Sequence, residues 1–176
     1  MFKRSSVVSS LVALMVGCFM VAGSQADDVA VPDSLTPDLS SLVNQFGEPF
    51  KGRDGEALVM LVAGMKVKDM VRETLAEVDS GCLQDGRVIY LANISGMPKL
   101  VSKFIAVPRL RDLNYPVWLD YSGGVASGLP FHKGQVTLLS LGESSKAIEV
   151  SFADSQAYLK EQLLVRCEAS TVKLTD

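Results

Sequence analysis

The sequence has few of the residues that enzyme active sites commonly use. Its 176 residues include one histidine, His132, and three cysteines. A Ser-His-Asp or Cys-His site would have to use His132, but neither Ser127 nor Ser140 has a nucleophile-elbow motif around it. One histidine and distant cysteines also lack the spacing of a metal-ligand set. We therefore expect no catalytic residue and no metal site.

Phosphate-binding motifs are missing as well. Gly52-Arg53-Asp54-Gly55 and Gly123-Gly124 have neither the Gly-x-Gly-x-x-Gly spacing nor the Lys-Ser/Thr ending that would hold a phosphate. Both stretches are typical of turns. We expect no cofactor.

The start of the chain has the order of a secretion signal. Lys3 and Arg4 precede an almost wholly apolar or small run from Val7 to Ala22, and Ser24-Gln25-Ala26 offers small residues for cleavage. The unbroken apolar part is shorter than the ~20 residues that span a bilayer. We predict a signal peptide over residues 1–26. The alternative is lipoprotein processing at Cys18, because Met15-Val16-Gly17-Cys18 resembles a lipobox.

The charge of the remaining 150 residues excludes some partners. Residues 1–26 hold two of the 17 basic and none of the 20 acidic residues, which leaves a net charge of −5. Nucleic acids and anionic membranes attract clustered Lys and Arg, so neither is the expected partner. No later stretch is long and apolar enough to span a bilayer. We predict a periplasmic protein of unknown oligomeric state.

Two cysteines, Cys82 and Cys167, remain after cleavage. An even pair in an oxidising compartment predicts a disulfide, and two free buried thiols are the alternative. They are too far apart in the sequence for a Cys-x-x-Cys motif.

The region 27–55 is predicted to be a leader. Thr36-Pro37-Asp38 has the pattern of a helix start, and Leu39, Leu42, Val43 and Phe46 follow at helical spacing before Gly47. We expect a short amphipathic helix and then a loop.

From residue 56 to 176 the patterns predict one α/β domain. Apolar runs at 58–63, 88–92 and 116–120 predict strands, 135–141 and 146–150 predict a hairpin, and 153–165 predicts a final helix. Val67, Met70, Val71, Leu75 and Val78 predict a helix after the first strand. A second helix is expected to begin at Ser95-Gly96-Met97-Pro98. Its inner side is predicted to comprise Leu100, Val101, Phe104 and Ile105, and Pro108 is expected to kink or stop it. The basic group Lys99, Lys103, Arg109 and Arg111 on and after it is typical of a solvated face, with an acidic partner as the alternative.

This order resembles the thioredoxin fold. Tyr115-Pro116-Val117-Trp118-Leu119-Asp120 is similar to the "xPVLLD" segment of periplasmic thioredoxin-like proteins, and Lys133-Gly134-Gln135-Val136-Thr137 is similar to their Gly-x-Pro-Thr stretch. The resemblance covers roughly residues 56–166. It implies a mixed sheet with helices on both faces, a terminal β-hairpin and a C-terminal helix.

Two departures from the family limit what the resemblance implies about activity. Gly64-Met65-Lys66-Val67-Lys68 stands where the family has Cys-x-x-Cys, and Val136 stands where it has a cis proline. Disulfide exchange needs a thiolate, so the usual activity is not expected. The topology also implies that Cys82 and Cys167 lie at the pole opposite the groove, as a structural disulfide.

The predicted function is therefore a non-catalytic protein that binds or helps assemble another cell-envelope protein. The predicted binding surface comprises Met65, Lys66, Lys68, Phe131, His132 and Val136. One alternative is a thiol-disulfide or peroxide-handling enzyme that uses Cys82 and Cys167. Another is a structural accessory subunit.

Overall fold

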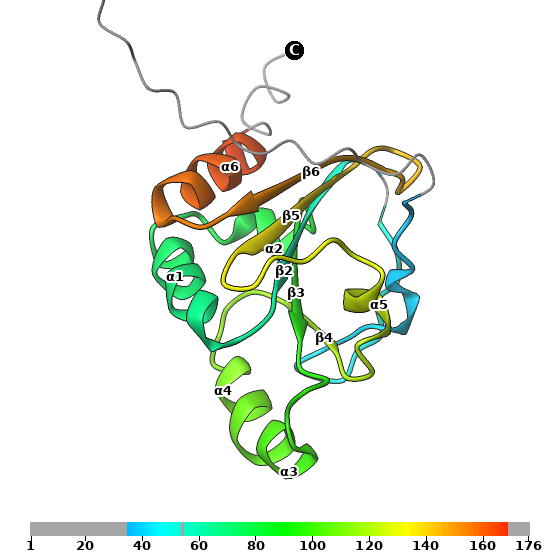
Figure 1. The fold of residues 1–176 in the computed structure, drawn as a ribbon, viewed down its shortest axis with the longest axis vertical. Helices are drawn as coiled ribbons and strands as arrows, with labels where there is room; N and C mark the ends of the chain where they lie inside the picture. The colour runs from blue at the N-terminus through cyan, green and yellow to red at the C-terminus, as the bar shows by residue number, and fades with distance from the viewer. Residues whose placement is uncertain (1–34, 54, 169–176) are drawn as a thin grey trace, which may run out of the picture.

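The computed structural model describes residues 35–53 and 55–168, which form a six-stranded mixed sheet flanked by helices (Figure 1). The predicted signal peptide and Cys18 lie outside these residues. The strand order across the sheet is β1-β4-β3-β2-β5-β6. The strands are β1 (Val43–Asn44), β2 (Ala57–Val62), β3 (Val88–Asn93), β4 (Val117–Asp120), β5 (Val136–Leu141) and β6 (Ala147–Ala153).

Strand direction divides the sheet into two parts. β2, β3 and β4 are parallel, whereas β5 is antiparallel to β2 and β6 is antiparallel to β5. All residues of β2 and β5 are buried, as expected for strands covered on both faces. The predicted mixed sheet with a terminal hairpin and a C-terminal helix is confirmed.

One face of the sheet carries two long and two short helices. They are α1 (Met65–Ala76), α2 (Gly81–Gln84), α4 (Val107–Leu110) and α6 (Gln156–Glu168). In α1, Val67, Val71 and Leu75 recur every four residues, so one stripe of the helix packs on the sheet. Leu159 and Leu163 do the same for α6. The predicted stripe of the first helix is thus confirmed.

The opposite face is covered by two short helical segments. These are the 3₁₀ helix η1 (Leu39–Ser41) and α5 (Gly124–Ser127). Val59 and Leu61 of β2 point to this face, because successive side chains of a strand alternate between the two faces. Helices therefore cover both faces, as predicted.

The amphipathic helix expected around residues 36–47 does not form. Only Leu39–Ser41 is helical, and β1 then pairs antiparallel with β4. Asn44 Oδ1 accepts the backbone N–H groups of Phe46 and Glu48, both at 3.0 Å, and so fixes a turn where the last turn of the predicted helix would lie. This segment therefore adds a strand to the edge of the sheet.

The second helix is interrupted, and its predicted inner side was wrong. It consists of α3 (Lys99–Val101), a π-helical turn η2 (Ser102–Ala106) and α4. Ser102 and Val107 face the core, while Leu100 and Phe104 are 71 % and 65 % exposed. Pro108 has no N–H for the carbonyl of Phe104, and the Val107 N–H bonds instead to Ser102, five residues back.

Candidate functional site

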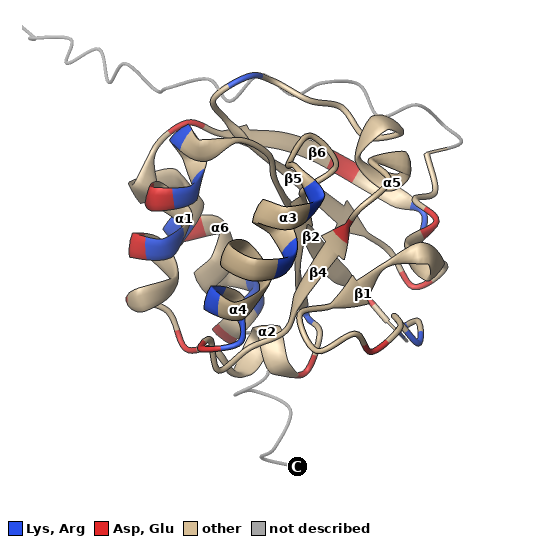
Figure 2. Cartoon of the chain, turned by 90° about the horizontal axis from the view of Figure 1, so that it is seen from below, with Lys and Arg blue, Asp and Glu red and all other residues tan. Residues whose placement is uncertain are grey.

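The carboxyl ends of β2, β3 and β4 meet at one end of the sheet, the end we call the groove pole. The loops that follow them are residues 63–64, 94–98 and 121–123. Ligands of open α/β sheets bind at this end of parallel strands. Figure 2 views the molecule from this end, with α3 in the foreground.

The junction between β2 and α1 contains no thiol. Gly64, at φ +94°, makes the turn into the helix, a conformation that L side chains rarely adopt. Met65 follows and is 71 % exposed. Lys66 lies against the turn before β5, since its Nζ is 3.6 Å from the position of a Cβ added to Gly134.

The connections around this junction decide the fold. β2, α1 and β3 form a parallel unit, the β5-β6 hairpin lies beside β2, and α6 contacts α1 and β3. This is the arrangement that the sequence resemblance implied. The fold is thioredoxin-like.

Comparison with solved structures finds distant matches. The N-terminal domain of PilB from Neisseria gonorrhoeae is 14 % identical over 78 % of this chain and 96 % of its own, with a TM-score of 0.48. An uncharacterized thioredoxin-like protein from Porphyromonas gingivalis is 15 % identical over 76 % and 93 %, with a TM-score of 0.49. No protein-family model and no curated protein matches the chain.

A hollow of about 480 Å³ opens at the groove pole of this thioredoxin-like fold. It lies between the ends of β2 and β3 and the segment around α5. Its apolar lining includes Leu61, Leu129 and the half-exposed Phe131, and its polar lining includes Asn93 and Ser95.

The polar groups near the hollow are engaged in local structure. Asn93 Oδ1 accepts both the backbone N–H and the hydroxyl of Ser95. Asp120, only 2 % exposed, accepts the N–H groups of Gly123 and Ala126 at 2.7 and 2.9 Å, and so fixes the start of α5. These side chains position loops, and the arrangement suits binding better than acid-base chemistry.

The structure divides the predicted binding residues into four groups. Phe131 lines the hollow, whereas Met65, Lys66 and Lys68 do not. His132 lies against β6, where its ring stacks on Phe152 at 4.0 Å and its Nδ1 is 3.1 Å from Gln135 Oε1.

Val136 belongs to the core and not to the surface. Its side chain is fully buried in the cluster under α1, so it offers nothing to a partner. Its inclusion in the predicted surface was wrong, because Val136 begins strand β5, which buries this position. All peptide bonds of the described residues are trans.

The two cysteines of the described residues lie at the opposite pole. Cys82 in α2 and Cys167 in the last turn of α6 form a disulfide with a Cα separation of 5.0 Å. Cys82 is only 1 % exposed. The predicted pairing is confirmed, and the disulfide is remote from the β2-α1 junction.

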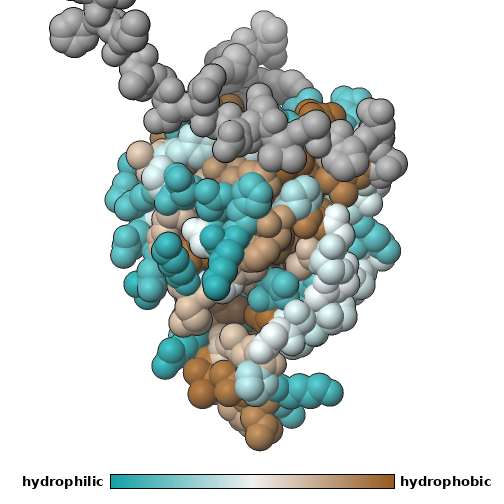
Figure 3. All heavy atoms as spheres, in the orientation of Figure 1, coloured by the Kyte–Doolittle hydropathy of each residue, from teal (hydrophilic) through white to brown (hydrophobic). Residues whose placement is uncertain are grey.

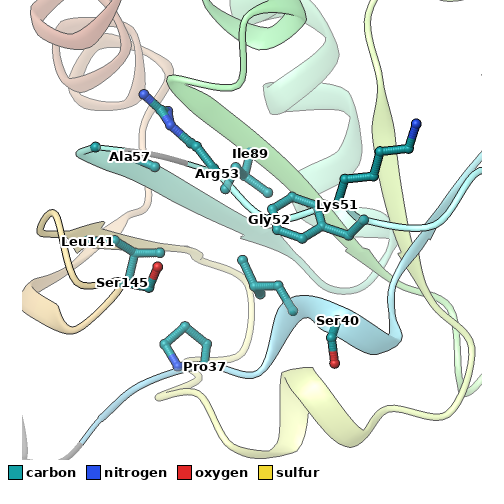
Figure 4. A pocket seen from close by; sticks show the side chains of 12 residues that line it. Pro37, Ser40, Lys51, Gly52, Arg53, Ala57, Ile89, Leu141 and Ser145 are labelled. Carbon is teal, nitrogen blue, oxygen red and sulfur yellow. The ribbon is translucent and has the colours of Figure 1, made fainter.

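A second hollow, of about 400 Å³, lies near the start of β2, away from the groove pole (Figure 4). Its lining includes the core residues Leu39, Ile89 and Leu141, and Figure 4 shows Arg53 pointing out of it. Its described lining has no carboxylate, thiol or imidazole.

The largest feature that sequence reasoning missed is an exposed apolar ridge at the groove pole. It is formed by Leu100, Val101, Phe104 and Ile105 of α3 and η2, which we call the α3 ridge. In Figure 3 hydrophobic side chains gather at this projecting end of the molecule. The helix carries apolar side chains on two sides. Pro108 was the one signal in the sequence that the helix is irregular, so that helical spacing alone would not show which side is buried.

Across the part of the chain that the structure describes, no helix has the length and apolar character to cross a membrane.

Proposed function

We propose that this chain is an exported, non-catalytic thioredoxin-like protein that binds or helps assemble another protein of the cell envelope. The observation that carries the proposal is the β2-α1 junction, which offers Met65 and Lys66 where thioredoxin chemistry needs a thiolate. The open groove pole then remains as a binding surface.

The disulfide supports a structural role for the cysteines. Cys82 is buried, so an attacking thiolate could approach the bond only at Cys167, which is itself partly buried. Arg87 also donates to the backbone carbonyls of Arg166 and Cys167, at 3.0 and 2.7 Å, and covers the end of α6. These contacts favour a structural disulfide over the alternative of a thiol-disulfide or peroxide-handling enzyme.

The disulfide and the signal-like start together support an oxidising compartment outside the cytoplasm. Mass measurement of the protein from the cell envelope tests export. We expect a chain that begins at or near Asp27 without lipid. Diacylglycerol on Cys18 would contradict a free periplasmic protein.

Single-cysteine variants test the function. If the protein is a binding module, Cys82→Ser and Cys167→Ser proteins should form no discrete mixed disulfide with an envelope protein, and a noncovalent complex should survive in the double variant. A discrete mixed disulfide formed by one single-cysteine variant and absent from the double variant would identify a redox enzyme instead.

A further inference from the structure

The α3 ridge is not required by the core. The helix is anchored by Ser102 and Val107, which are buried, and by Met97 and Leu110, which pack partly against the core. The large apolar side chains point the other way. Covering them would remove apolar surface from water, which favours association.

The geometry of the ridge fits an elongated partner. Leu100 and Phe104 are four residues apart, as are Val101 and Ile105, so the two pairs form adjacent rows along the helix. An amphipathic helix can lay a matching apolar stripe along such rows.

The positive charge around the ridge favours a negatively charged partner. Residues 94–111 contain Lys99, Lys103, Arg109 and Arg111 and no acidic residue. Figure 2 shows only Lys and Arg coloured along α3 and α4. Within the described part of the chain, Lys99 and Lys103 have no ion-pair partner, and Lys103 Nζ lies 5.5 Å from the ring centre of Phe104.

A second copy of the chain that docked through the same ridge would be repelled by this positive charge. A twofold contact uses the same patch on both subunits, so it would bring Lys99 and Lys103 against the same lysines. Like charges in an interface oppose binding. Carboxylates beside an apolar stripe would be complementary instead.

We propose that the α3 ridge is a docking site for an amphipathic, acidic segment of an envelope protein. Apolar side chains of that segment cover Leu100 and Phe104, and its Asp or Glu side chains pair with Lys99 and Lys103. This inference rests on the proposed binding function and names the surface and the chemistry of the partner.

A helical peptide library displayed on phage tests the proposal without a known partner. We expect the purified protein to select peptides with Asp or Glu beside an apolar stripe. Binding of a selected synthetic peptide should weaken roughly tenfold or more in Leu100→Ser/Phe104→Ser and in Lys99→Glu/Lys103→Glu. Added salt should weaken it in the wild type and strengthen it in the charge-reversed variant, where salt screens the repulsion between like charges.

Matched controls lie elsewhere on the surface. Ile148→Ser, at a residue that is 57 % exposed, and Lys51→Glu/Lys146→Glu should leave peptide affinity unchanged. Each ridge variant should keep the wild-type melting temperature to within a few degrees, because the changed side chains are exposed.

Several results would overturn the proposal. They are selected peptides that are basic or neutral, peptide affinity that the ridge variants leave unchanged, or a dimer in sedimentation that Leu100→Ser/Phe104→Ser dissociates. Ridge-dependent binding to vesicles of phosphatidylglycerol and phosphatidylethanolamine, with no acidic peptide selected, would assign the ridge to a membrane. Binding elsewhere would refute this docking site only, whereas disulfide turnover would refute the non-catalytic function only.

Discussion

Removal of the Cys82–Cys167 disulfide should destabilise the protein strongly without unfolding it at room temperature. The bond joins residues 85 apart in the sequence. In the chain-entropy model, closure of a loop of this length stabilises by about 4.5 kcal/mol, within a total of ~5–15 kcal/mol for a domain. For a domain of this size that loss lowers the melting temperature by roughly 15 °C.

Other contacts should hold α6 in place when the bond is absent. Leu159 and Leu163 are fully buried, and Arg166 pairs with Glu56 at 3.2 Å. We therefore expect a single cooperative transition at lower temperature.

The assay compares thermal unfolding of the wild type, oxidised and reduced, with Cys82→Ala/Cys167→Ala and the corresponding serine variant. Serine at buried position 82 adds a hydroxyl that needs a partner, so the alanine variant isolates the bond better. Reduced wild type and the alanine variant should melt at similar temperatures. Equal melting of oxidised and reduced protein, or two titratable thiols in the native protein, would refute the reasoning.

Three further perturbations follow from buried or strained positions. Gln45→Ala should lower the free energy of unfolding by about 2–3 kcal/mol in urea, because Gln45 is 1 % exposed and its Oε1 accepts the Val117 N–H at 2.8 Å; a change below experimental error would contradict this. Burial raises the pKa of Tyr90 above its ordinary 10.0, so the unfolded chain loses this proton at lower pH than the folded protein does. The free energy of unfolding should therefore be unaffected below pH 10 and should fall as the pH rises above 10. Tyr90→Phe should flatten that fall in melting curves taken across alkaline pH. Gly123→Ala should also lower the melting temperature, because Gly123 has φ +76° and an added Cβ would lie 2.7 Å from Ser95 Oγ; an unchanged melting temperature would show that the loop relaxes.

Patterns that depend on burial alone gave correct predictions of the fold. The apolar run around β2 and the four-residue spacing of Val67, Val71 and Leu75 predicted a central strand and the helix on it. The hairpin and the final helix followed from the same kind of pattern. Helical spacing around residues 36–47 predicted a helix, however, where the chain instead forms a 3₁₀ turn and then a strand that pairs with β4.

The site was less predictable, because it depends on which of two apolar faces is buried. Leu100 and Phe104 have the spacing of a core stripe, and only tertiary packing shows that Ser102 and Val107 take that place. The absence of a thiol at Gly64–Lys68 is visible in the sequence itself, because it depends only on which residues stand there. The disulfide was predictable because topology alone brings the ends of two helices on one face to the same pole.

The non-catalytic character of the protein is the central claim, and turnover of insulin disulfides measures it most directly. Purified protein, supplied with dithiothreitol or with a thioredoxin reductase system, should reduce insulin no faster than Cys82→Ala/Cys167→Ala or a blank, because residues 64–68 offer no thiolate. Turnover comparable to that of a thioredoxin, abolished in the double variant, would contradict the account.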